Sequence, residues 1–129
     1  MKAKLISTEG PYLEAVLEIE GTKIHVMDEF SLDIESSPKI GDEFDFEFSN
    51  MADEDESWES IFSGNPERKI GVEQISGWKY RCFGKIISVD PVVVDCGLFK
   101  EEEVVSTHDE KVVGEYIAFT ISRLGGYAI

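Results

Sequence analysis

The segment 106–109 reads Ser-Thr-His-Asp and contains the residue types that nucleophilic catalysis uses. A catalytic triad is a geometric arrangement, and adjacent residues in a polar loop seldom aim at one atom. We therefore expect this segment to be a solvated loop. The other histidine, His25, lies on the outward parity of a hairpin strand, where we expect a surface residue. The sequence thus predicts no catalytic residue, and the chain is not expected to be an enzyme.

Metal and cofactor motifs are the next candidates. The segment 53–57, Asp-Glu-Asp-Glu-Ser, has the alternating acids of a calcium loop, but Trp58 stands where the loop needs glycine and Gly64 where it needs glutamate. The two cysteines and two histidines lack zinc spacing, and there is no glycine-rich phosphate loop. Acids are so abundant that no single pair indicates a glycosidase or a protease. We predict no metal and no cofactor.

Cys82 and Cys96 fall on strands that flank one predicted turn near Asp90-Pro91. On such a hairpin the two residues are not directly opposite, so the short Cα separation that a disulfide needs is not expected. We predict two buried, reduced thiols. Two cysteines without a CxxC pair fit a reducing cytoplasm best.

The most unusual stretch is residues 40–67, which hold ten acids and no lysine or arginine. Its densest part precedes a predicted short helix near residues 56–63, with Ser57 or a preceding acid as cap and Gly-Asn-Pro at the end. One interpretation is a solvated charged loop whose aromatics cap the core. The other is a recognition surface, where carboxylates steer a basic partner and an aromatic anchor slows its departure. On that interpretation the partner-binding residues are Asp53, Glu54, Asp55, Glu56, Trp58, Glu59 and Phe62.

The elements that must position this surface are strands. In residues 41–49 a glycine is followed by phenylalanines on one parity and acids on the other, the period of a strand with one wet face. The same frame returns at 114–122, with Ile117, Phe119 and Ile121 facing inward. Three successive valines at 92–94 suggest burial on both faces. Further strands are predicted at 2–8, 12–20, 23–30, 68–76, 77–89 and 92–99, with polar loops at 31–39 and 100–111 and a glycine bend at 125–126.

These patterns predict an all-β single domain over residues 1–129, a barrel or sandwich of about seven or eight short antiparallel strands. The hairpin and following strand of residues 13–49 resemble those of 80–122, which suggests two meander repeats. The alternative is that any β meander repeats its turns and its alternation. The sequence does not decide between a barrel and a sandwich, or between a true repeat and an ordinary meander.

The composition of the chain limits which classes of partner it can bind. With 129 residues, 42% of them hydrophobic, the chain can bury a core without disulfides. Its net charge of −15 disfavours nucleic acid and anionic membranes, and favours a basic protein. No apolar run approaches the ~18 residues of a membrane helix. The N-terminus lacks a secretory apolar region, so we expect a soluble cytoplasmic protein.

In size, charge and lack of catalytic motifs, the chain resembles the small acidic immunity proteins of bacterial toxin systems, including those of contact-dependent growth inhibition. The resemblance implies a protein that neutralises a basic toxin, often a nuclease, by covering its nucleic-acid site. The alternative is an OB-like or SH3-like adaptor domain in a larger assembly. The loop with Glu101, Glu102 and Glu103 is the alternative interface.

Overall fold

A computed structural model describes all residues, Met1–Ile129, and confirms the all-β class with one short α-helix. Eleven strands are present where the sequence predicted about seven or eight, because several are only two to four residues long. The strands are β1 (Lys2–Thr8), β2 (Glu14–Ile19), β3 (Thr22–Asp28), β4 (Glu43–Phe48), β5 (Met51–Ala52), β6 (Gly71–Ser76), β7 (Lys79–Ser88), β8 (Val93–Asp95), β9 (Lys100–Glu102), β10 (Tyr116–Arg123) and β11 (Gly125–Ala128). The helix is α1 (Trp58–Ser63), and a 3₁₀ turn, η1, covers Glu110–Val112.

The chain forms two compact units. Unit 1 comprises Met1–Met51, Ile75–Lys79 and Ser122–Ile129, and unit 2 comprises Ala52–Gln74 and Tyr80–Ile121. The prediction of a single domain over 1–129 stays a prediction. Neither helical segment has the length and apolar character that a membrane-spanning helix needs.

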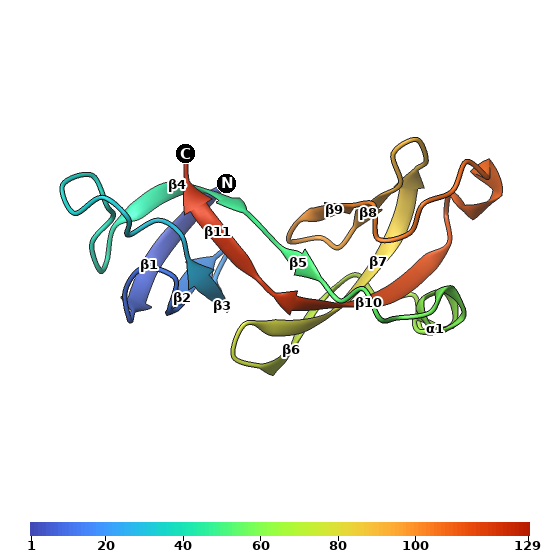
Figure 1. The fold of residues 1–129 in the computed structure, drawn as a ribbon, viewed down its shortest axis with the longest axis horizontal. Helices are drawn as coiled ribbons and strands as arrows, with labels where there is room; N and C mark the ends of the chain where they lie inside the picture. The colour runs from blue at the N-terminus through green and yellow to red at the C-terminus, as the bar shows by residue number, and fades with distance from the viewer. The chain divides into compact units, whose positions relative to one another are not determined.

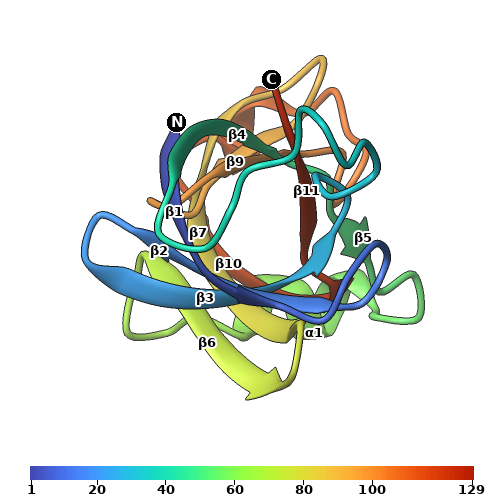
Figure 2. The same cartoon turned by 90° about the vertical axis from the view of Figure 1, so that its left-hand side faces the viewer.

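Unit 1 is a closed barrel with strand order β1-β2-β3-β11-β4, so barrel replaces sandwich here (Figure 2). The pairs β1–β2, β2–β3, β1–β4 and β4–β11 are antiparallel, whereas β11 runs parallel to β3. The predicted glycine bend at 125–126 is the start of β11. That strand closes the barrel because Gly126 has no side chain: a Cβ there would lie 2.0 Å from Cζ of Phe46.

The phenylalanines of β4 point as their spacing predicts. Phe46 is fully buried and Phe44 and Phe48 are half-buried, while the acids between them are exposed. The Phe46 ring lies edge-on to Phe44 and Phe48, with ring centroids 6.0 and 5.0 Å away. This cluster fills the barrel and shows that the period-two pattern set the strand's facing correctly.

One buried carboxylate stabilises the end of β3. Asp28 is inaccessible to solvent, and its oxygens accept hydrogen bonds from the Thr8 hydroxyl, the Phe30 and Ser31 backbone N–H groups, and the Ser31 hydroxyl. Four donors replace the water that burial removes, which is the condition for keeping a carboxylate inside. His25, expected at the surface, is half-buried and lies 3.2 Å from Glu14.

The second sheet has the order β5-β10-β7-β8-β9, and β6 pairs with β7 (Figure 1). In the antiparallel pair of β7 and β10, Phe119 lies opposite Cys82 and Ile121 opposite Tyr80 on the buried face. The other face carries Arg81, Phe83 and Lys85, opposite Thr120, Ala118 and Tyr116. This second face positions the candidate site.

Three further predictions meet the structure in this sheet. The loop predicted at 100–111 contains β9, because Lys100–Glu102 pairs with β8. Of the three valines, Val92 and Val94 are buried, whereas Val93 is half-buried. Both hairpins of the suggested repeat are present, as β2 with β3 and β7 with β8, but the strand after each pairs differently. β4 pairs with β1 and β11, whereas β10 pairs with β7 and β5.

Candidate functional site

The helix α1 forms where its capping residues predict it. Ser57 is the N-cap, and its hydroxyl accepts a hydrogen bond from the Ser60 N–H at 3.2 Å. The helix ends at Gly64, whose N–H donates to the Ile61 carbonyl at 3.3 Å. Ser63 donates its hydroxyl to the Glu59 carbonyl at 2.7 Å. A six-residue helix is marginal alone, so packing must hold it in place.

That packing is against β10. A Cβ on Gly64 would lie 2.9 Å from both the Ala118 Cβ and the Arg81 guanidinium, so the backbone meets the sheet directly. Ile61 is the buried residue of α1. Because α1 covers this face, Ala118 and Thr120 are buried although their parity predicts exposure.

Asn65 joins the end of α1 to the sheet. Its side-chain amide donates to the Ile117 carbonyl at 3.2 Å and to the Lys69 carbonyl at 2.9 Å, and its oxygen accepts from the Lys69 N–H at 2.8 Å. The residue is buried, and these three bonds use the donors and the acceptor of one amide. The turn after α1 is therefore held to β10 by a satisfied polar group.

Glu56, predicted to face a partner, turns inward. Its carboxylate lies 2.6 Å from the Arg81 guanidinium and accepts the backbone N–H of Thr120. The same guanidinium donates to the Thr120 hydroxyl at 3.1 Å. The Glu56 side chain is only 16% exposed. Its charge is thus matched inside unit 2 and contributes to the fold of the segment before α1.

The other predicted acids lie outward. Glu54, Asp55 and Glu59 are exposed and form no ion pair. Asp53 is half-buried, and its carboxylate accepts the Asp55 N–H at 2.9 Å, which fixes the turn before the helix. Three carboxylates with no counter-ion therefore surround the start of α1.

The two predicted aromatics form a pair on α1. Trp58 is 51% exposed, so it is not a core residue, and its ring centroid lies 6.2 Å from that of half-buried Phe62. Residues four apart share one face of a helix, which is why the two rings meet. Half of the Trp58 surface is in solvent, and the partner-binding interpretation of this residue stays a prediction. We call Trp58 and Phe62, together with Glu54, Asp55 and Glu59, the α1 surface.

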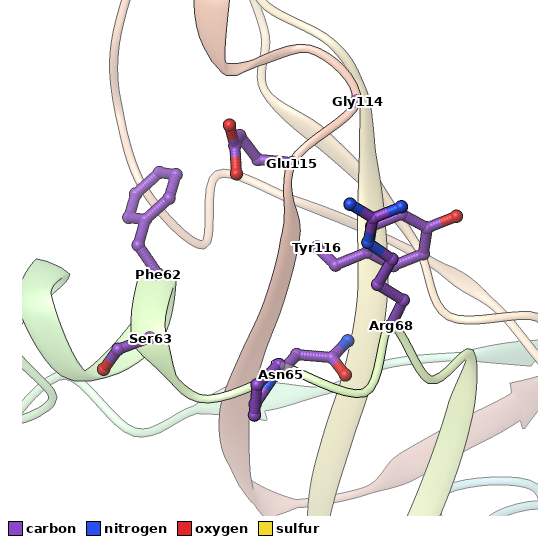
Figure 3. Close-up of a pocket in the computed structure, with 8 residues that line it drawn as sticks. Phe62, Ser63, Asn65, Arg68, Gly114, Glu115 and Tyr116 are labelled. Carbon is purple, nitrogen blue, oxygen red and sulfur yellow. The ribbon is translucent and has the colours of Figure 1, made fainter.

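A pocket of about 360 Å³ lies beside the α1 surface (Figure 3). Phe62 and Ser63 come from α1, and Asn65 and Arg68 come from the turn after it. Tyr116 is the first residue of β10, and Glu115 directly precedes it. Arg68 lies over the Tyr116 ring at 5.9 Å from its centroid, and Lys85 at 5.8 Å. These cations contact an aromatic face instead of an acid.

The remaining predicted features lie elsewhere in unit 2. In the 106–109 segment, the Asp109 carboxylate accepts the Lys111 N–H within the loop, and His108 contacts Asp90 in the turn between β7 and β8. Cys82 and Cys96 are free and buried, as predicted. Burial raises the pKa of Cys82, with further contributions from Cys96 and Glu101, and burial also raises the pKa of Cys96 to about 12. Of the alternative acidic interface, Glu101 is half-buried and Glu102 and Glu103 are exposed.

Sequence reasoning missed Glu115, Asn65 and Arg68 as neighbours of α1. Glu115 stood out only as a polar residue at the start of a predicted strand, and nothing local connects it with Phe62. The signal that was present is Gly-Asn-Pro at 64–66, which ended the helix correctly. It could not show that Asn65 bonds a strand 52 residues later.

Comparisons of the chain with protein families, with curated proteins and with solved structures found no match.

Proposed function

We propose that this chain binds and neutralises a basic protein, as an immunity protein neutralises a toxin nuclease in the bacterial cytoplasm. The observation that carries the proposal is the α1 surface, where a half-exposed tryptophan stands among carboxylates that have no counter-ion. The proposed role is one of binding, with no chemical step. On a toxin nuclease, the α1 surface would cover the site that binds nucleic acid.

Electrostatics supports a basic partner. The net charge of −15 attracts cations at long range, and exposed carboxylates act over a Debye length of about 8 Å at physiological ionic strength. Glu54, Asp55 and Glu59 are free to do so because no lysine or arginine pairs with them. Their expected contribution is to the association rate.

Packing supports a buried anchor. Trp58 exposes about half of its surface beside Phe62, and aromatic residues of this kind dominate the energetics of protein interfaces. Burying the Trp58 ring in a partner's pocket would slow dissociation by about 2 kcal/mol or more in the activation free energy. The acids and the aromatic pair thus have separable effects on kinetics.

The test is to express the product of the neighbouring gene with and without this chain and to measure growth, then binding kinetics at two salt concentrations. Protection from a toxic product, with direct binding, is the expected result. The variant Glu54→Gln/Asp55→Asn should slow association and weaken its salt dependence, and Trp58→Ala should speed dissociation. The matched control is Glu20→Gln/Glu43→Gln, which removes two exposed acids of unit 1.

If neither α1 variant changes the binding kinetics, the interface does not lie on α1, and the acids at 101–103 would be tested next. Toxicity that this chain does not relieve, with no binding by the neighbouring product, would refute the proposal.

A second candidate is an adaptor domain of the OB-like or SH3-like kind. The closed barrel of unit 1 favours it, because small barrels of five strands commonly serve as recognition modules. An adaptor would remain in a large assembly when a cell extract is fractionated by size, and its deletion would leave toxin sensitivity unchanged. A neutralising protein predicts the opposite in both measurements.

A further inference from the structure

Backbone hydrogen bonds and a capped helix hold the walls of the pocket in Figure 3. On one side, the Gly114 N–H donates to the Ile86 carbonyl at 2.8 Å and the Ile86 N–H donates to the Glu115 carbonyl at 2.9 Å, so Glu115 is fixed to β7 from its backbone. Gly114 has a φ of +96°, a conformation that glycine adopts without strain. On the other side, capped α1 carries Phe62, and Asn65 holds the turn between the walls. A pocket ordered before binding costs little further entropy.

Two side chains of the pocket, Glu115 and Phe62, are available to bind a ligand. Glu115 is exposed and forms no ion pair, and the half-buried Phe62 has Trp58 as its aromatic neighbour. In Figure 3 the Glu115 carboxylate projects to the side of β10 on which Phe62 lies. Arg68, the cation that lines the same pocket, lies over Tyr116 on the other side.

We infer that this pocket receives an arginine side chain of the bound protein, with its guanidinium between the Phe62 ring and the Glu115 carboxylate. The inference rests on the proposed function for the identity of the protein that supplies the arginine. The guanidinium is planar, stacks on aromatic faces and forms two parallel hydrogen bonds with one carboxylate. Phe62 and Glu115 offer one of each contact within a single pocket.

On the side of the pocket where Phe62 lies, the charged lining group is Glu115, which favours a cation there. A carboxylate that enters beside Phe62 would approach Glu115, which has no counter-ion. Arg68 would attract it toward the Tyr116 ring, on the side of β10 away from Phe62, and leave the space between Phe62 and Glu115 unfilled. A lysine would satisfy Glu115 as a point charge and would lack the planar stacking contact with Phe62. The chemistry of the pocket therefore matches arginine best.

The experiment titrates isotope-labelled full-length protein with N-acetyl-arginine amide and follows the backbone amide signals by NMR. We expect saturable shifts at Phe62, Ser63 and Glu115. N-acetyl-citrulline amide, which has nearly the same shape without the charge, should produce none. Glu115→Gln should weaken arginine binding about tenfold, the scale for replacing one charge-assisted contact. Glu110→Gln, the matched control, removes an exposed acid from the nearby η1 turn and should leave the binding unchanged.

Equal shifts with citrulline, an unaltered affinity in Glu115→Gln, or no saturable shift at these residues would overturn the inference. Shifts at Arg68 and Tyr116 with sodium acetate, and none with arginine, would assign the pocket to acids instead. The proposed function fails separately: absence of a protein partner, with saturable arginine binding, would refute neutralisation and leave the pocket. If a confirmed partner binds Glu115→Gln as tightly as wild type, and replacing the partner's arginines also leaves the affinity unchanged, the arginine pocket alone is refuted.

Discussion

Removing the inward carboxylate of Glu56 is the sharpest test of the structure around α1. Glu56→Gln keeps the shape of the side chain but leaves one oxygen for two donors, the Arg81 guanidinium and the Thr120 N–H. The amide NH₂ must then face one of those donors. We expect the free energy of unfolding to fall, because a donor loses its acceptor at a half-buried position.

The magnitude follows from the contacts. A hydrogen bond to a charged group contributes about 1.5–3 kcal/mol, and leaving a donor unsatisfied costs about 1–3 kcal/mol. Arg81 is 27% and Glu56 16% exposed, so water can replace part of the loss. We therefore expect a decrease of about 2–3 kcal/mol for Glu56→Gln, less than the sum of the two contributions.

The assay is urea unfolding followed by circular dichroism. A decrease of that size lowers the midpoint by about 1–2 M, given typical urea dependences for small proteins. The control is Glu54→Gln, which alters an exposed acid without contacts and should change stability by less than about 0.5 kcal/mol. A double-mutant cycle with Arg81→Met should return a favourable coupling. If both glutamine variants unfold at the wild-type midpoint, Glu56 lies in solvent and the reasoning is wrong.

The remaining predictions concern the two cores. Phe46→Ala should lower the free energy of unfolding by about 3–5 kcal/mol because it empties a buried site, while Asp45→Ala on the same strand should change it little; equal urea midpoints would contradict this. A thiol reagent at neutral pH should react with neither Cys82 nor Cys96 in the native protein and with both after unfolding, because burial keeps the thiols protonated; fewer than two thiols after unfolding would reveal a disulfide. Above the ordinary thiol pKa of 9.0, the unfolded state loses thiol protons that the native state keeps. The free energy of unfolding should therefore fall by up to about 1.4 kcal/mol per pH unit for each thiol. For Cys96 this decline ends near its folded pKa of about 12. Cys96→Ala should make the decline between pH 9 and 10 shallower, and an unchanged slope would contradict the assignment.

Local pattern predicted much of the fold. The alternation in residues 41–49 placed Phe46 inside and its acidic neighbours outside, because side chains of a strand point to opposite faces in turn. Ser57 and Gly64 bounded α1 correctly, because capping needs only neighbouring residues. The free cysteines were predicted from their positions on a hairpin, where they are not directly opposite, and both are free and buried.

Pairing between distant segments could not be predicted in this way. Residues 125–126 were expected to bend because glycine is flexible, but they form a barrel strand because only glycine leaves room for the Phe46 ring. Lys100–Glu102 is too short and polar to stand out as a strand, and it becomes one by pairing with β8. In both cases a neighbour remote in sequence decides the structure.

The acidic segment shows the same division. The sequence by itself determined that 53–56 is a run of four acids ahead of a capped helix, with Trp58 and Phe62 on one helical face. Only the tertiary structure decided that Glu56 turns inward while Glu54 and Asp55 stay in solvent. The physical reason is that its partners lie 25 and 64 residues away, at Arg81 and Thr120, and come together only when β7 and β10 pair beneath it.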